Sequence, residues 1–229
     1  MRHSNAPLAT ALFLAASLTA MSQSSTAAQP TLPASNPFAA VSTLPLHYPR
    51  FDRIKDSDFA PAFDAGMAEQ LREVRAIADN PAAPTFDNTL VALERSGQVL
   101  DRAQTVFFNL VGADTNDARN KLRSDYAPRF SAHSDAILLD SKLFARIESL
   151  YARRAALQLD AEAVRLIERY HSDFVRAGAK LSAADKEKLK AMNAELATLG
   201  SRFTQNVLDE VNASAVVVDD TRLALGRLG

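Results

Sequence analysis

Hydrophobic residues recur at spacings of three and four along most of this chain, which is the pattern of amphipathic helices. The first predicted helix begins at Ser57 or Asp58, either of which can cap its N-terminus, and it tolerates Pro61 in its opening turn. It ends at the Asn-Pro-Ala-Ala-Pro run of residues 80–84. Its inward face is predicted to consist of Phe59, Phe63, Met67, Leu71, Val74 and Ile77.

A second predicted helix starts at the N-cap residue Thr85 and has Asp87 in its first turn, where the helix dipole favours an anion. Its apolar stripe continues without interruption, so we expect one helix, with Gly112 as its terminator. The stripe consists of Phe86, Leu90, Leu93, Leu100, Phe107 and Leu110.

Two more helices follow. The third is predicted from Asn116 or Asp117 to about Leu139, with a bend near Pro128 because proline removes a hydrogen bond of the helix interior. The fourth begins at Ser141 and carries an apolar face that ends with an aromatic residue. That face is formed by Leu143, Ile147, Leu150 and Tyr151.

The fifth and sixth helices are separated by a clear stop. Asp160 caps the fifth helix and Gly178 ends it, whereas Ser182 opens the sixth as a capping box with Asp185 in the place of glutamate. The sixth is the longest, and Gly200 softens its middle. It carries an apolar seam suited to antiparallel pairing, made of Leu189, Met192, Leu196, Leu199, Phe203 and Val207.

The ends of the chain read differently from the middle. Residues 1–28 have the composition of a signal peptide: Arg2 precedes a short apolar run over residues 8–18, and small residues up to Ala28 suit a signal peptidase. The apolar run is too short to cross roughly 30 Å of hydrocarbon, so a retained membrane anchor is the less favoured alternative. We therefore expect export to a bacterial periplasm, cleavage near Ala28, and no membrane attachment afterwards.

The predicted fold class is all-α with one short C-terminal strand. After the signal peptide comes a Pro-rich extended arm over residues 29–55, and a single helical domain over residues 56–212 follows it. Residues 213–229 are predicted as a short strand, formed by the valines 216–218, and a tail without periodicity. One strand needs a partner for its backbone hydrogen bonds, which hints at further sequence elsewhere.

Composition narrows the function. The chain of 229 residues is 47% hydrophobic and 23% charged, and its formal net charge is −1, so it offers no strong field for binding nucleic acid. It contains no cysteine, which excludes disulfides, thiolate metal sites and a cysteine nucleophile. A metal would have to be bound by histidine and carboxylate side chains.

The candidate chemistry is sparse. The histidines beyond the signal peptide, His47, His133 and His171, do not have the i, i+4 spacing of an HExxH zinc helix. Asp219 and Asp220 are adjacent strand residues that point to opposite faces and so cannot share one proton. No serine lies in a nucleophile motif, and the glycines form no phosphate-binding loop. We therefore predict no catalytic and no metal-binding residue in this chain and assign no substrate-binding residue.

Several ordered runs nevertheless resemble the amino-terminal part of bacterial peptidyl-dipeptidases, which are zinc metallopeptidases of the thimet-oligopeptidase-like family. The matches extend over nearly the whole chain after the signal peptide. They comprise residues 36–38 (NPF), 42–45 (STLP), 51–62 (FDRIKDSDFAPA), 80–81 (NP), 84–89 (PTFDNT), 92–97 (ALERSG), 113–117 (ADTND), 143–146 (LFAR), 177–181 (AGAKL), 203–206 (FTQN) and 217–220 (VVDD).

This resemblance implies a function that the residues alone do not. Members of the family are almost wholly helical, with a deep channel for short peptides, and they release dipeptides from the carboxyl terminus of oligopeptides. The family's zinc and its ligands lie beyond the matched region, so the resemblance implies that this chain forms part of the channel wall, binds no zinc itself, and is inactive without a C-terminal catalytic half. This reading also predicts that at least one apolar helix face is left exposed. The alternative is a self-contained periplasmic helical module that binds peptides, or acts as an adaptor, without cleaving them.

Overall fold

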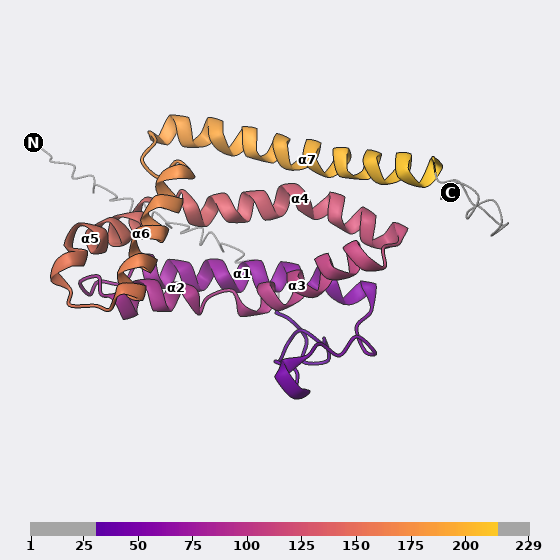
Figure 1. Cartoon of the computed structure of the whole chain (residues 1–229), viewed down its shortest axis with the longest axis horizontal. Helices are drawn as coiled ribbons and strands as arrows, with labels where there is room; N and C mark the ends of the chain where they lie inside the picture. Colours follow the sequence, from indigo (N-terminus) through magenta and orange to yellow (C-terminus); the bar gives the residue numbers. More distant parts are fainter. Residues whose placement is uncertain (1–30, 215–229) are drawn as a thin grey trace, which may run out of the picture.

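A computed structural model describes residues 31–214, and within that range every regular element is helical. The all-α prediction is therefore confirmed for these residues, whereas the predicted signal peptide and the predicted strand at residues 216–218 lie outside them. The molecule is elongated, with α5 and α6 gathered at one end (Figure 1). The α-helices are α1 (Phe59–Ala78), α2 (Ala92–Glu94), α3 (Gln98–Ala113), α4 (Asp117–Leu138), α5 (Ser141–Arg153), α6 (Ala161–Arg176) and α7 (Ala183–Ala213).

Two clusters of buried residues stabilise the fold, and α1 contributes to both. In the first cluster, Phe63 of α1 lies against Phe107 of α3 and Tyr126 of α4, with ring centroids 5.2 and 5.0 Å apart. The Pro-rich arm is anchored here, because Phe38 is 3% exposed and its ring lies 5.3 Å from that of Phe59. Burying aromatic rings of this size is among the larger single contributions to stability.

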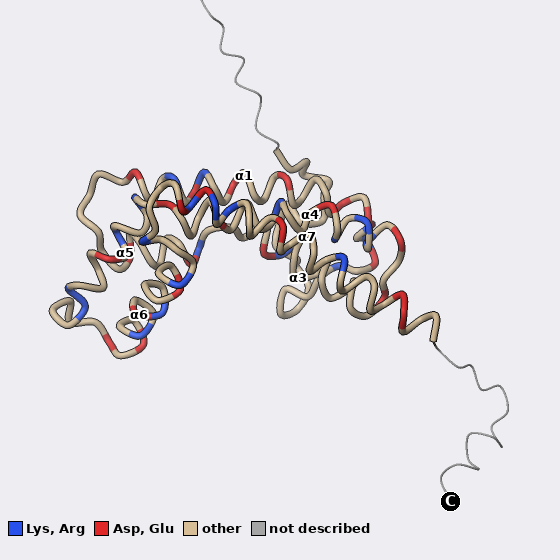
Figure 2. Tube along the Cα trace, turned by 90° about the horizontal axis from the view of Figure 1, so that it is seen from above, with Lys and Arg blue, Asp and Glu red and all other residues tan. Residues whose placement is uncertain are grey.

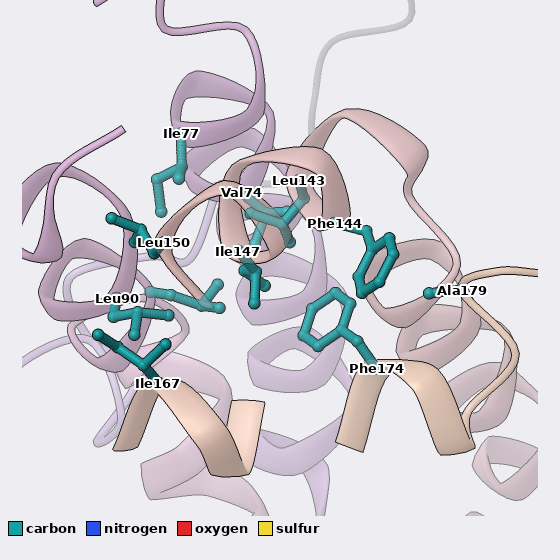
Figure 3. Packing of buried hydrophobic residues seen from close by; sticks show 11 residues of the cluster. Val74, Ile77, Leu90, Leu143, Phe144, Ile147, Leu150, Ile167, Phe174 and Ala179 are labelled. Carbon is teal, nitrogen blue, oxygen red and sulfur yellow. The ribbon is translucent and has the colours of Figure 1, made fainter. Parts of the chain in front are cut away.

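The second cluster lies at the other end of α1, among α5, α6 and the segment that follows α1 (Figure 3). Ile147 of α5 and Ile167 of α6 are fully buried there, and Phe144 stacks on Phe174 at 6.3 Å between ring centroids. In this cluster the predicted inward residues of α1, of the segment after it and of α5 are buried, except Phe86 and Tyr151, which are half-buried. The members of this cluster include Val74, Ile77, Leu90, Leu93, Leu143, Phe144, Ile147, Leu150, Ile167, Phe174 and Ala179.

The second predicted helix is not continuous, and this corrects the sequence prediction. A π-helical segment (Phe86–Val91) passes into the short α2, the chain then breaks at Gly97, and α3 begins at the next residue. Gly97 has a φ of 74°, in the left-handed region that residues with a Cβ atom adopt at an energetic cost. The spacing of apolar residues continues across Gly97, so the sequence pattern gave no sign of the break.

Most predicted helix starts are confirmed by side-chain caps. The N-cap side chains of Thr85, Asn116, Asp160 and Ser182 each accept a hydrogen bond from a backbone N–H of the first turn. The helix at Ser141 is capped by the residue before it, Asp140.

Two predicted caps are wrong. Asp58 does not cap α1, because its Oδ2 accepts a hydrogen bond from the N–H of Lys55 in the preceding turn instead. Gly112 does not end its helix, since α3 continues to Ala113 and the residue that follows it is Asp114. Gly178, in contrast, ends α6 as predicted, with a φ of 100° and a hydrogen bond from the N–H of the next residue to Phe174 O.

Helix α7 packs antiparallel on α4, but not through the predicted seam (Figure 1). The contact is made by polar side chains instead: Asn193 donates to Asp135 at 2.7 Å, and Arg123 donates to Gln205 at 2.8 Å. The apolar seam therefore faces away from α4, and most of it is exposed. Periodicity finds an apolar face, but the specific polar contacts decide which face of α7 meets its neighbour.

Candidate functional site

The histidines that could have bound a metal do not meet. His133 of α4 is buried against α1, where its Nε2 lies 2.6 Å from Gln70 Oε1. His171 of α6 stacks on Tyr151 of α5 at 3.8 Å between ring centroids. His47, in the arm, places Nδ1 3.0 Å from the carbonyl oxygen of Ser42. Each imidazole is thus used in packing or in a local hydrogen bond.

Burial governs the electrostatics of two of these rings. It lowers the pKa of His133, which has no charged partner, because desolvation disfavours the imidazolium form. Burial also lowers the pKa of His171, and the nearby Lys180 ammonium adds to the effect. Both rings are therefore expected to be neutral at pH 7.

The described residues do not fit a zinc site. A protein zinc site needs at least three side chains that converge on the ion, and residues 31–214 contain no group of three or more histidine or carboxylate side chains placed to do so. The predicted absence of a metal site in this chain stays a prediction.

The buried Tyr126 and the half-buried Tyr170 act as structural hydrogen-bond donors. Tyr126 donates to Asp64 at 2.8 Å, and burial followed by this carboxylate raises the pKa of Tyr126 to about 12. Arg129 lies over the Tyr126 ring at 4.3 Å and also donates to Asp64. Tyr170 donates to Glu94 at 2.7 Å, and its pKa is likewise raised, chiefly by burial. These phenols stay protonated near neutral pH and join helices rather than act as bases.

A concave feature lies between the arm and α3. It is a cavity of about 670 Å³, within the size range of small-ligand sites. Its wall is partly apolar, from Phe38 and Val106, and partly charged, from Arg53, Asp101 and Arg102. The buried Nε of Arg102 has no hydrogen-bond partner among the described residues, although its Nη2 donates to Phe38 O at 2.9 Å. The arm thus forms a wall of this cavity, which sequence periodicity could not show.

The exposed face of α7 is the other surface feature of note. We call it the α7 stripe, and it is apolar although α7 lies at the edge of the molecule (Figure 1). Phe203 is 70% exposed and Leu196 is 64% exposed, which is unusual for such large side chains on one helix face. The expectation of an exposed apolar helix face is confirmed. The stripe consists of Met192, Leu196, Leu199, Phe203, Val207 and Val211.

The charge distribution and the hydropathy of the described residues indicate no functional surface besides the cavity and the α7 stripe. Lysine and arginine alternate with aspartate and glutamate along the described helices (Figure 2), consistent with the formal net charge of −1. Within residues 31–214, no helix combines the length and the apolar character needed to cross a bilayer.

Several of the sequence runs that carry the family resemblance contact one another in the structure and join separate elements. Arg146 is 7% exposed and donates to Asn80 O at 2.8 Å, to Ala82 O at 3.0 Å and to Asn88 Oδ1 at 2.8 Å, so it fastens the loop between α1 and α2 onto α5. These residues come from three separate runs, at 80–81, 84–89 and 143–146, or from the loop between them. The loop is thereby held by charge-assisted hydrogen bonds to an arginine with little exposure to water.

A second joint links the start of α1 to the start of α4. Asp56 accepts from Arg119 Nε at 2.7 Å and from Asn116 Nδ2 at 2.8 Å, and Arg119 also contacts Asp114. Burial alone would raise the pKa of Asp56, but the hydrogen bonds from Asn116 and Arg119 outweigh it and lower that pKa.

Comparison with known proteins gives a specific match. The chain is 45% identical over 185 residues to the dipeptidyl carboxypeptidase of Escherichia coli (strain K12). It is similar to dipeptidyl carboxypeptidases. The dipeptidyl carboxypeptidase of Salmonella typhimurium (strain LT2) is 44% identical over 191 residues. These alignments cover 81% and 83% of this chain, which confirms the resemblance read from the sequence.

The alignments cover most of this chain but only a small part of each relative. The chain spans about a quarter of the length of these dipeptidyl carboxypeptidases, 27% of the first and 28% of the second. No protein-family model matches the chain.

Proposed function

We propose that this chain is the part of a dipeptidyl carboxypeptidase that forms a wall of its peptide-binding channel. The observation that carries the proposal is the identity of about 45% to two proteins of that name over more than four fifths of the chain. The short peptides from which such an enzyme removes C-terminal dipeptides are then its ligands. The elongated helical structure, with an arm that closes a cavity against α3, is compatible with a positioning role.

In this proposal the hydrolytic residues and the zinc belong to the rest of the enzyme. The 229 residues contain no HExxH sequence, and the described histidines lie in separate places. The remaining part of the enzyme is therefore the chain's main partner, and this chain alone releases no dipeptide. The proposal also includes export to the periplasm through residues 1–28. N-terminal sequencing of the protein purified from the periplasm of cells that express it tests this, and we expect the mature chain to begin after Ala28.

A chimera tests the channel-wall role. The matched segment of the E. coli relative is replaced by the aligned residues of this chain, and the chimera is supplied with zinc and an N-acetylated oligopeptide that has a free carboxyl terminus. We expect dipeptides to be released from this substrate and not from the same peptide as its C-terminal amide. The isolated chain, assayed in parallel with zinc, is the matched control and is expected to release none.

Two outcomes would contradict the proposal. A folded chimera that binds zinc but does not cleave the peptide would show that this chain cannot serve as the wall. Dipeptide release by the isolated chain would show that it carries its own catalytic site. Binding of peptides by the isolated chain, together with an inactive chimera, would favour the alternative of a non-catalytic peptide-binding or adaptor module.

A further inference from the structure

Helix α7 takes no part in the core that the rest of the chain forms. Among the residues that the structure describes, neither buried cluster contains a residue of α7, and the side chains that join α7 to α4 are polar. Most of the stability of a helix in a protein comes from packing of its apolar face rather than from helix propensity. For α7 that face is the α7 stripe, and the described residues do not bury it.

The stripe is large and continuous. Its six side chains, from Met192 to Val211, are between 46% and 70% exposed and follow one another at spacings of three or four residues. They therefore lie along one side of the helix over about 28 Å at 1.5 Å per residue. Gly200 lies beside them and leaves open space, with no atom within 4 Å of the position of an added Cβ. Contiguous apolar surfaces of this kind are typical of contact sites, and the absence of charge in the stripe suits an apolar partner.

The relatives provide such a partner. Nearly three quarters of each dipeptidyl carboxypeptidase lies outside the segment that aligns with this chain. Because the resemblance is to the amino-terminal part of the family, the remaining sequence follows the segment that contains α7. A surface that belongs to the same polypeptide loses less entropy on contact with the stripe than a separate molecule does. The rest of the enzyme is therefore favoured as the occupant.

A peptide substrate fits the stripe less well. Ligand sites in proteins are concave and contain a few polar groups that fix the ligand, and no residue of the stripe lines the cavity between the arm and α3. A peptide also brings backbone donors and acceptors that need hydrogen-bond partners. The stripe offers none from its side chains, because its residues are methionine, leucine, phenylalanine and valine.

We propose that the α7 stripe is the surface on which the rest of the dipeptidyl carboxypeptidase packs, through an apolar surface of that part. The proposal rests on the proposed function, which makes that part the partner of this chain. It assigns the stripe to a permanent contact inside the enzyme, so the wall of the peptide channel lies on other residues of this chain.

Labelling of introduced cysteines tests the proposal, because the chain has no cysteine of its own. Leu196→Cys and Phe203→Cys each place a thiol on the stripe, and mass spectrometry of the peptide that contains it measures its rate of modification by a maleimide. Each rate is compared between the isolated chain and the chimera described above, relative to the same variant in denaturant. We expect labelling at least about tenfold slower in the chimera, because the rest of the enzyme covers the thiol.

Arg202→Cys is the matched control for the labelling. Arg202 is exposed on the same helix but lies about 100° around the helix axis from Phe203, outside the stripe. Its labelling rate should be nearly the same in the isolated chain and in the chimera. Equal slowing at all three positions would show that protection is not specific to the stripe and would overturn the proposal. Rapid labelling of Leu196→Cys and Phe203→Cys in the chimera would overturn it as well.

A carboxylate on the stripe gives a second measurement. Phe203→Asp replaces an exposed side chain in the isolated chain, so its melting temperature should shift by at most about 2 °C. In the chimera the carboxylate would face an apolar surface, so sensitivity to limited proteolysis should rise at least about tenfold. Arg202→Asp adds the same group outside the stripe and should leave the chimera resistant. If the Phe203→Asp chimera were equally resistant, the proposal would be wrong.

Other occupants of the stripe would give different results. Slow labelling in the isolated chain would show that this chain's own residues cover the stripe or, where dilution speeds the labelling, that a second copy does. Protection that appears in the chimera only after a peptide is added would make the stripe part of the peptide channel. Each of these outcomes overturns the proposal.

Failure of this proposal is distinguishable from failure of the proposed function. A chimera that releases dipeptides but leaves the stripe open to labelling retains the function and overturns the contact. A chimera that protects the stripe but releases no dipeptide retains the contact and overturns the function.

Discussion

His133 Nε2 of α4 lies 2.6 Å from Gln70 Oε1 of α1, and this buried contact joins the two helices beside the break at Gly97. The amide oxygen can only accept, so Nε2 donates and the neutral ring carries its proton there. The other ring nitrogen, Nδ1, is buried without a hydrogen-bond partner among the described residues. Protonation of His133 would therefore place a charge at a largely buried position, which desolvation disfavours.

The stability of the fold is expected to fall as the pH decreases from 7 through about 6.5, the ordinary pKa of histidine. The pKa of His133 is lowered in the folded state, so the unfolded chain binds the proton first and acid favours unfolding. The loss continues down to the lowered pKa and then stops growing. Thermal unfolding followed by circular dichroism between about pH 5 and 7 measures it.

The variant His133→Gln keeps a side-chain donor but does not titrate, so its melting temperature should depend less on pH in this window. His171→Gln is the matched comparison, because the pKa of His171 is also lowered, chiefly by burial and then by Lys180. Each variant should remove part of the slope. If His133→Gln and the wild type had the same pH dependence, the buried imidazole would not be the group responsible.

Gly97→Ala is expected to destabilise the fold by about 1–3 kcal/mol. The φ of 74° disfavours any residue with a Cβ, and the added atom would lie 2.4 Å from Gln70 Cδ and Nε2. Displacement of Gln70 would also break its contact with His133. Urea unfolding measures the change.

Gly112→Ala is the control, because Gly112 lies inside α3 with no atom within 4 Å of the added Cβ. We expect it to be stabilising by about 0.5–1 kcal/mol, since alanine is the better helix former. Equal effects of the two substitutions would show that neither the backbone angle nor the neighbour at Gly97 matters.

Asn88→Ala is expected to be destabilising by about 2–4 kcal/mol, because it removes the acceptor of the buried Arg146 guanidinium and of the Thr85 N–H. Asn88 Oδ1 accepts from Thr85 N at 2.8 Å and from Arg146 Nη2 at 2.8 Å, and Asn88 Nδ2 donates to Ala83 O at 2.9 Å. Removal of the side chain thus affects the helix cap and the joint to α5 together. Thermal and urea unfolding of the purified chain measure the loss.

Thr85→Ala separates these two roles. It removes the hydroxyl that accepts from Asn88 N at 3.1 Å but leaves the contact with Arg146 intact, so a loss of about 1 kcal/mol is expected. If Thr85→Ala lowered the free energy of unfolding as much as Asn88→Ala, the helix cap would account for the whole effect and the contact between Asn88 and Arg146 for none of it.

The helices were predictable because their signals are local. The caps at Thr85, Asn116 and Ser182 and the terminator Gly178 are short-range features, and the structure has them where the sequence indicated. The break at Gly97 was missed because the apolar stripe keeps its phase across it. Only the approach of Gln70 and the hydrogen bond from Gly97 N to Glu73 Oε2, at 2.8 Å, show why the chain turns there.

Contacts between distant helices could not be predicted from spacing. Lys186 looks like a solvated charge in the sequence, yet it is 8% exposed and donates to Leu139 O and Ser141 Oγ, both at 2.9 Å. That contact, with Asn193 and Gln205 farther along, turns the polar face of α7 toward α4 and leaves its apolar stripe outside. The wall that the arm contributes to the cavity likewise depends on Phe38 reaching a core more than twenty residues away in the sequence.

Arg119→Ala is expected to be destabilising by about 1–3 kcal/mol near neutral pH, because it removes the cation that joins Asp56 to the start of α4. Lys121→Ala is the matched control on the same helix: its partner Asp125 is at 2.8 Å, but both side chains are more than half exposed, so we expect less than about 0.5 kcal/mol.

The two effects should also differ with pH. The pKa of Asp56 is lowered in the folded state, so its contribution is present above the ordinary value of 3.8 and is lost as the pH falls through the lowered one. The destabilisation by Arg119→Ala should therefore shrink in acid, which urea unfolding at neutral and at low pH would measure. If the destabilisation were the same at both pH values, the joint would be held by packing of the arginine side chain and not by its pairing with the ionised Asp56.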